Sequence, residues 1–141
     1  MDEKTSGSSR IPGSVIFVAI LNFLSAALFL LLILGAIGAL VFGNFVGVYE
    51  YFLRQVSERY PQINISFGLN FLFGLVLAVG LLFFTLFLFI GAGLLKGKRI
   101  AWYLQIVSSV LGLFNYPLGT VLSAAILVFF FQNSVRSFFK V

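Results

Sequence analysis

Long stretches without any charged residue dominate this chain, and short polar segments separate them. They cover residues 14–49, 61–95 and 100–135, and Asn115-Tyr116-Pro117 divides the last stretch in two. About 20 apolar residues are enough to cross a hydrocarbon core of about 30 Å. The pattern therefore predicts an all-α fold, a transmembrane four-helix bundle. Its helices are expected at about residues 12–43, 68–95, 100–115 and 117–139.

Residues 45–60 follow a different pattern, in which apolar residues recur at helical spacing with polar residues between them. Glu50, Arg54 and Glu58 lie four residues apart among these polar positions, a spacing that supports a helix. A helix with one apolar and one polar face is typical of the membrane interface. We therefore expect an extracytoplasmic interfacial amphipathic helix between the first two spans, ended by Pro61.

The basic residues predict the orientation of the spans, because Lys and Arg are concentrated in cytoplasmic loops. Four spans with the N-terminus inside place seven of the nine basic residues in the cytoplasm and only Arg54 and Arg59 outside, whereas three spans give five against four. The last two predicted helices are near the lower length limit of a span, so whether they cross fully stays open. The seven residues expected inside are Lys4, Arg10, Lys96, Lys98, Arg99, Arg136 and Lys140.

These observations predict a multi-pass protein of the cell (cytoplasmic) membrane with both termini in the cytoplasm. Residues 1–11 form a polar cytoplasmic tail, and residues 12–141 form a single membrane domain. Trp102 and Tyr103 are expected at the inner interface, where Trp and Tyr side chains concentrate.

The composition argues against several classes of function but does not indicate a particular one. The chain is 61% hydrophobic and 9% charged, whereas soluble domains carry about 25% charged residues. The net charge of +5 does not indicate nucleic-acid binding, because the basic residues stand at the ends of apolar runs. The chain has no His and no Cys, and its predicted spans contain no Asp or Glu. We therefore expect no enzymatic activity, no metal and no cofactor.

Small residues recur at every fourth position near the end of the first predicted helix. Such spacing makes a flat face on a helix, against which a second helix backbone can pack closely. The favoured interpretation is packing within the chain, with Gly74 and Ala78 as a possible facing surface; a contact with a partner is the alternative. This small-residue stripe consists of Gly35, Ala39, Gly43 and Gly47.

Asn22 and Gln105 are the most informative polar residues inside the predicted spans, because a carboxamide in hydrocarbon needs a hydrogen-bond partner. One interpretation is an intramembrane polar spot that binds a small ligand or a headgroup. The favoured one is that the two side chains bond each other or a nearby backbone carbonyl.

Five basic residues form an inner basic rim, which consists of Lys96, Lys98, Arg99, Arg136 and Lys140. Near a membrane surface each Lys or Arg attracts anionic lipid headgroups by about 1 kcal/mol. The positive-inside rule alone also explains their position, and the two explanations are compatible.

The C-terminal part of the chain resembles a layout found in small four-span membrane proteins of bacteria and archaea. The resemblance covers about residues 91–141. It rests on Leu95-Lys96-Gly97-Lys98-Arg99-Ile100-Ala101-Trp102, Pro117-Leu118-Gly119-Thr120 and Val135-Arg136-Ser137-Phe138-Phe139. It implies four helices and a prokaryotic cytoplasmic membrane, and it transfers no catalytic or binding residues.

The function expected from these features is non-catalytic. We predict an accessory or structural subunit that packs in a larger membrane complex or in a homo-oligomer. The alternative is a small transport protein or a protein that binds lipid or a small molecule. The expected partners are the lipid bilayer, anionic headgroups and other membrane subunits or further copies of the chain, without nucleic acid.

Overall fold

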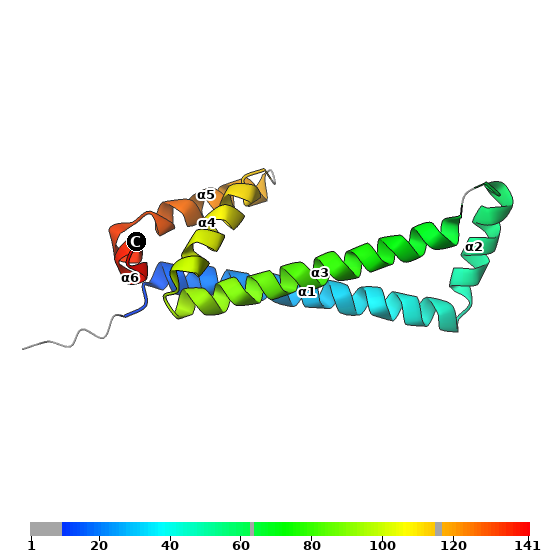
Figure 1. Ribbon diagram of the computed structural model, residues 1–141, viewed down its shortest axis with the longest axis horizontal. Coiled ribbons are helices and arrows are strands. Elements are labelled where there is room, and N and C mark those ends of the chain that lie inside the picture. The colour runs from blue at the N-terminus through cyan, green and yellow to red at the C-terminus, as the bar shows by residue number, and fades with distance from the viewer. Residues whose placement is uncertain (1–9, 63, 115–116) are drawn as a thin grey trace, which may run out of the picture. The chain divides into compact units, whose positions relative to one another are not determined.

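The computed structural model of the protein describes residues 10–62, 64–114 and 117–141, and their regular secondary structure is entirely helical. This confirms the predicted all-α class. The helices are α1 (Gly13–Phe45), α2 (Val48–Arg59), α3 (Ile65–Leu95), α4 (Arg99–Gly112), α5 (Leu118–Phe130) and α6 (Asn133–Phe139) (Figure 1). The predictions that concern residues 1–9, including Lys4, and the turn at Asn115 and Tyr116 lie outside the described residues.

The described chain divides into two compact units. Unit 1 contains the described residues up to Leu24 together with Phe87–Val141, and unit 2 contains Ser25–Leu86. The helices α1 and α3 therefore contribute residues to both units, whereas α4, α5 and α6 belong to unit 1 and α2 belongs to unit 2.

Unit 1 contains nearly all of the buried apolar side chains, and all five of its helices supply them. Trp102 is 7% exposed, and its indole N–H donates to the carbonyl of Phe130 at 3.4 Å. Of the two aromatic residues expected at the interface, only Tyr103 is exposed. The buried apolar residues of this unit are Val15, Val18, Ala19, Ile90, Leu94, Ala101, Trp102, Ile126, Phe130, Val135 and Phe139.

A tight turn joins α3 to α4 and brings their backbones close together. Gly97 has a φ of +63°, a conformation that glycine adopts without steric cost, and the next residue but one already begins α4. Gly93 faces Ala101 so closely that a Cβ built on Gly93 would lie 2.6 Å from the Cβ of Ala101. The two glycines thus permit both the reversal of the chain and the close packing that follows it.

The helices α4 and α5 pack against each other as a hairpin (Figure 1). The Ser123 hydroxyl occupies the space where a Cβ of Gly112 would lie. The Thr120 hydroxyl donates to the carbonyl of Leu113 at 2.8 Å and so satisfies an acceptor beyond the end of α4. At 14 residues, α4 is about 21 Å long, somewhat shorter than the predicted helix over 100–115.

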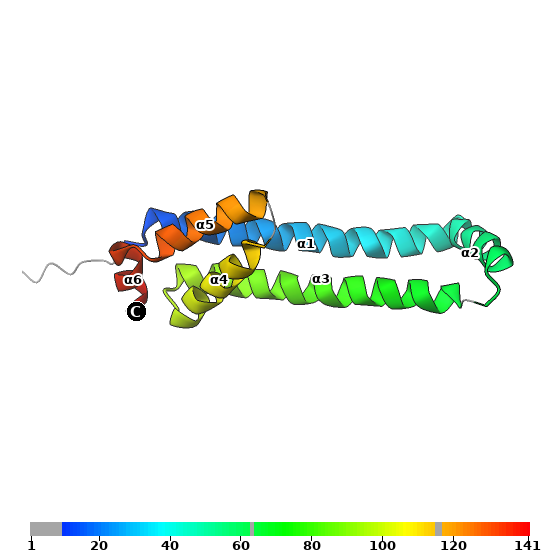
Figure 2. The same cartoon turned by 90° about the horizontal axis from the view of Figure 1, so that it is seen from above.

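The structure differs from the prediction of one helix over 117–139, because the chain bends by 71° between α5 and α6. The backbone of Gln132 is extended at the bend. The next two residues are Asn133 and Ser134, and Asn and Ser are residue types that favour helix ends. Figure 2 shows α6 turned away from the axis of α5. The bend buries Phe139, whose ring stacks on that of Phe130 with centroids 6.2 Å apart.

Unit 2 is a helical hairpin in which α2 connects α1 to α3 (Figure 1). The α1 and α3 segments pack through stacked rings of Phe29 and Phe83, 5.3 Å apart, and through Gly80, which accommodates Ile33. The Tyr49 hydroxyl of α2 donates to the side-chain oxygen of Asn70 at 3.2 Å. The amphipathic helix predicted over 45–60 is therefore present as a helix, with none of its residues buried.

Two helices, α1 with 33 residues and α3 with 31, are long and apolar enough to cross a membrane. The bent pair α5 and α6 passes the same criteria when it is taken as one span, which gives up to three spans among the described residues. Large apolar side chains are exposed along both long helices, for example Leu31 at 64%, Phe42 at 69% and Phe71 at 63%. Hydrocarbon covers such a surface without the cost that water would impose.

The contact between Gly93 and Ala101 predicts that Gly93→Ala destabilises unit 1 by about 1–3 kcal/mol, because the new methyl meets a Cβ that is fixed to the α4 backbone. Thermal unfolding in a mild detergent, followed by circular dichroism, measures the effect. Gly74→Ala is the matched control, since no atom lies within 4 Å of a Cβ built there. Equal stability of the two variants would contradict the packing described.

Candidate functional site

The polar residues Asn22, Gln105 and Ser109 form one buried group in unit 1, named here the polar cluster. Asn22 lies on α1, and Gln105 and Ser109 lie one turn apart on α4. Their exposed fractions are 4%, 5% and 3%. The structure thus brings together the two carboxamides that the sequence singles out, although they are 83 residues apart.

The hydrogen bonds of the polar cluster are made within the protein. The Asn22 amide nitrogen donates to Gln105 Oε1 at 2.7 Å and to the carbonyl oxygen of Val18 at 2.8 Å. The Gln105 amide nitrogen donates to the Ser109 hydroxyl at 3.2 Å. Among the described residues, no buried side-chain nitrogen or oxygen lacks a hydrogen-bond partner. The favoured interpretation is that the carboxamides bond each other or a nearby backbone carbonyl, and the Asn22 amide makes both kinds of bond.

The side chains of the polar cluster are better suited to a structural role than to catalysis. Carboxamides and hydroxyls do not take up or release protons near neutral pH, so the three side chains offer no general acid or base. The bond between Asn22 and Gln105 instead joins α1 to α4 inside the apolar core. Ser109 was not among the predicted site residues; its position four residues after Gln105, on the same helix face, is the sequence signal that indicates it.

The small-residue stripe does not form one continuous helix face. Gly35 and Ala39 are exposed on α1, and Gly43 is half-buried. Gly47 lies beyond the end of α1, in the turn into α2, where its φ is +72°. Only glycine adopts this left-handed conformation freely, so Gly47 serves the turn and not the predicted packing face.

The stripe is also not covered by the part of α3 proposed to face it. No atom of another described element lies within 4 Å of a Cβ built at Gly35 or at Gly74, and Ala78 is exposed. The close contact between α1 and α3 in unit 2 is instead made at Gly80, where an added Cβ would lie 2.9 Å from Ile33 Cγ1. Among the described residues, Gly35 therefore has no close neighbour from another element, and Ala39 is exposed.

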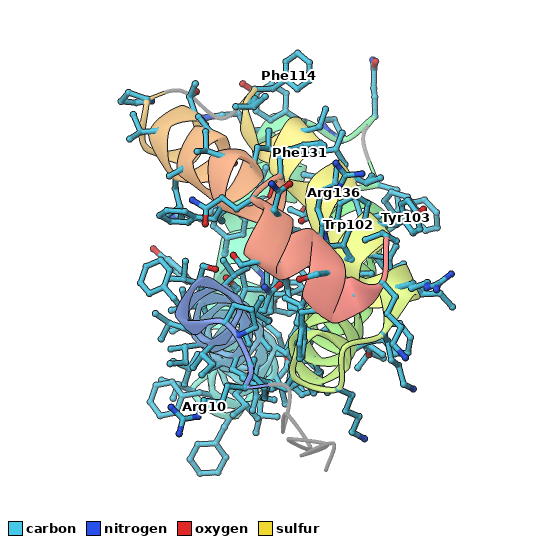
Figure 3. All side chains as sticks on the ribbon, turned by 90° about the vertical axis from the view of Figure 1, so that its left-hand side faces the viewer. Arg10, Trp102, Tyr103, Phe114, Phe131 and Arg136 are labelled. Atoms are coloured by element: carbon cyan, nitrogen blue, oxygen red, sulfur yellow. The ribbon has the colours of Figure 1, made fainter. Side chains whose placement is uncertain are left out.

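The inner basic rim lies in unit 1, and all five of its residues are exposed. Lys96, Arg99 and Lys140 line a common pocket of about 430 Å³, whose lining does not include Lys98 or Arg136. The apolar part of this lining consists of Ile11, Leu95, Phe138 and Phe139. Leu95 adjoins the basic turn in the sequence, but sequence reasoning missed Ile11, Phe138 and Phe139, because no local pattern relates them to that turn. Figure 3 shows Arg136 and Arg10 on different parts of this unit.

Comparison of the chain with models of protein families, with curated proteins and with solved structures gives no match. The resemblance to small four-span prokaryotic membrane proteins therefore stays a prediction.

The polar cluster predicts a measurable coupling between Asn22 and Gln105. Each single change to Leu leaves the other carboxamide without its partner and costs about 1–3 kcal/mol of unfolding free energy. The double variant costs less than the sum, because no unpaired carboxamide remains, with a coupling of about 0.6–1.7 kcal/mol.

Reversible unfolding in mixed micelles measures this cycle. Thr85→Val is the control, because the Thr85 hydroxyl donates to the Leu81 carbonyl of its own helix at 2.8 Å and makes no bond between helices. Strict additivity of the two Leu variants would argue against the bond as an interhelical link.

Proposed function

We propose that this chain is a non-catalytic membrane subunit, which packs through the exposed small-residue face of α1 against a helix of a second copy or of a larger membrane complex. The observation that carries the proposal is the uncovered position of Gly35 and Ala39. In hydrocarbon, helices associate through close backbone approach at Gly and Ala, since apolar burial supplies no driving force there. Gly38 widens the same face, with open space around it.

The alternative function, transport or binding of a small molecule through Asn22 and Gln105, has less support. The donor hydrogens of the Asn22 amide are directed at Gln105 and at the Val18 carbonyl. A ligand at this position would have to displace these internal bonds, and their loss would oppose its binding. We therefore place the function on the outer surface of the helices and not in the buried polar cluster.

The proposed topology has four spans, both termini in the cytoplasm and α2 in the outer interface. The distribution of Lys and Arg supports four spans over three, as counted above. The partly exposed Tyr49, Leu53 and Val56, with exposed polar residues such as Glu50 and Arg54 between them, suit a helix that lies between headgroups and water. Since α4 is about 21 Å long, its crossing requires local thinning of the bilayer or help from flanking residues.

Four spans predict that residue 141 lies on the cytoplasmic side. Green fluorescent protein fused after Val141 is then expected to fluoresce, and alkaline phosphatase fused at the same position is expected to be inactive. The same two reporters inserted after Arg59 give the opposite result, which serves as the internal control. Phosphatase activity at position 141 would exclude the four-span topology.

The assembly predicts that Gly35→Leu abolishes a defined complex, because a Leu side chain prevents the close approach of a second helix. The chain is purified from its membrane in a mild detergent, and the mass of the particle is measured by light scattering with detergent correction. A multiple of the chain mass indicates a homo-oligomer, and additional proteins of fixed stoichiometry indicate a larger complex.

Gly74→Leu is the matched control for this experiment. Gly74 is also an exposed helical glycine with open space around it, but it lies on α3. The same change there adds the same volume without altering the α1 face. A wild-type chain that runs as a monomer, or a Gly35→Leu chain that assembles like wild type, would contradict the proposal.

A further inference from the structure

Three cations of the inner basic rim and several apolar side chains line one pocket in unit 1, named here the basic pocket. Lys96 follows the last residue of α3, Arg99 is the first residue of α4, and Lys140 follows α6. Ile11 and Phe138 contribute to the apolar part of the wall. Three separate segments of the sequence, at residue 11, at residues 95–99 and at residues 138–140, therefore meet around a space of about 430 Å³.

Two residues with a left-handed backbone conformation, Gly97 and Lys140, help to position these three cations. Gly97, with a φ of +63°, reverses the chain after α3, and the amide of Lys98 bonds back into α3 at 2.9 Å. At the end of α6, Lys140 has a φ of +55°, and the amide of Val141 bonds back into α6 at 3.1 Å. Lys140 is the only non-glycine residue with positive φ in the described part of the chain. A glycine there would adopt this conformation at lower cost.

The described part of unit 1 contains no acidic side chain. Residues 10–24 and 87–141 contain neither Asp nor Glu, and the two acidic residues among the described ones, Glu50 and Glu58, belong to unit 2. Lys96, Arg99 and Lys140 are all exposed, and all three line the pocket. Among the described residues of unit 1, no Asp or Glu side chain is therefore present to neutralise these three cations.

We infer that the basic pocket binds a phosphate-bearing anion, and that the headgroup of an anionic phospholipid is the form its surroundings favour. Phosphate oxygens accept charge-assisted hydrogen bonds from guanidinium and ammonium groups. The apolar wall suits the glycerol and the first acyl carbons next to such a headgroup. Unit 1 also exposes Ile100 at 63% and Phe17 at 49%, which is a surface typical of contact with lipid.

The test uses the full chain purified in a neutral detergent, with phosphatidylglycerol or phosphatidylcholine added in a titration and the bound lipid counted by native mass spectrometry. The wild-type chain is expected to retain one phosphatidylglycerol and to lose phosphatidylcholine. Changing Lys96, Arg99 or Lys140 to Gln is expected to weaken phosphatidylglycerol binding about fivefold each, as for the loss of one cation near a headgroup.

Lys98→Gln and Arg136→Gln are the matched controls, because they remove the same charge from the same rim but do not line the pocket. They are expected to change the affinity for phosphatidylglycerol by less than about twofold, because salt screens the attraction between a headgroup and a more distant exposed charge. Lys140→Gly separates binding from folding: it relieves the left-handed backbone strain, so it should raise the unfolding temperature while weakening lipid binding.

Equal weakening by the pocket variants and by the two controls would overturn the inference, since it would indicate general attraction to the whole rim. Retention of phosphatidylcholine as firmly as phosphatidylglycerol, with no effect of inorganic phosphate, would overturn it as well. Displacement of phosphatidylglycerol by inorganic phosphate at comparable concentration would support the site and assign it to soluble phosphate. The inference does not depend on the proposed assembly, because Gly35 belongs to unit 2 and the pocket to unit 1.

Discussion

The apolar surface of α1 and α3 has to be covered by something other than water, and the rest of the molecule is arranged around this constraint. Side chains such as Leu31 and Phe71 are more than half exposed along helices of more than 30 residues. A helix satisfies its backbone hydrogen bonds internally, so it can present such a surface to hydrocarbon. Charged residues are consequently found at the ends of the long apolar runs and in the connecting segments, where water or headgroups solvate them.

Hydrocarbon around the helices changes what holds them together. Lipid tails are as apolar as a Leu side chain, so association depends on close backbone contacts and on hydrogen bonds between helices. Unit 1 has both kinds of contact: Gly93 lies against Ala101, Ser123 against Gly112, and Asn22 bonds Gln105. In the described part of unit 2, Gly80 lies close to Ile33, whereas Gly35 has open space around it on the α1 face that we propose for packing.

Much of the helical structure follows directly from the order of residues. Apolar runs interrupted by Pro61 and by the Lys96–Arg99 turn predict α1, α3 and α4 to within a few residues at their ends, and the amphipathic spacing predicts α2. The bend between α5 and α6 is harder to predict, because Val135 and Phe139 continue the apolar pattern. The burial of Phe139 against Phe130 favours the bent form, and that contact involves side chains that no local pattern relates.

The sequence by itself determines that the chain is helical and apolar, and it identifies Asn22 and Gln105 as polar groups that need partners, because these properties depend on residue type and local spacing. Only the tertiary structure decides that the two carboxamides meet, that Gly47 belongs to a turn and not to a packing face, and that three of the five rim cations share a pocket with Ile11 and Phe138. These outcomes depend on how the helices pack within each unit and on backbone conformation at single residues. Hydrophobic periodicity contains no information about either.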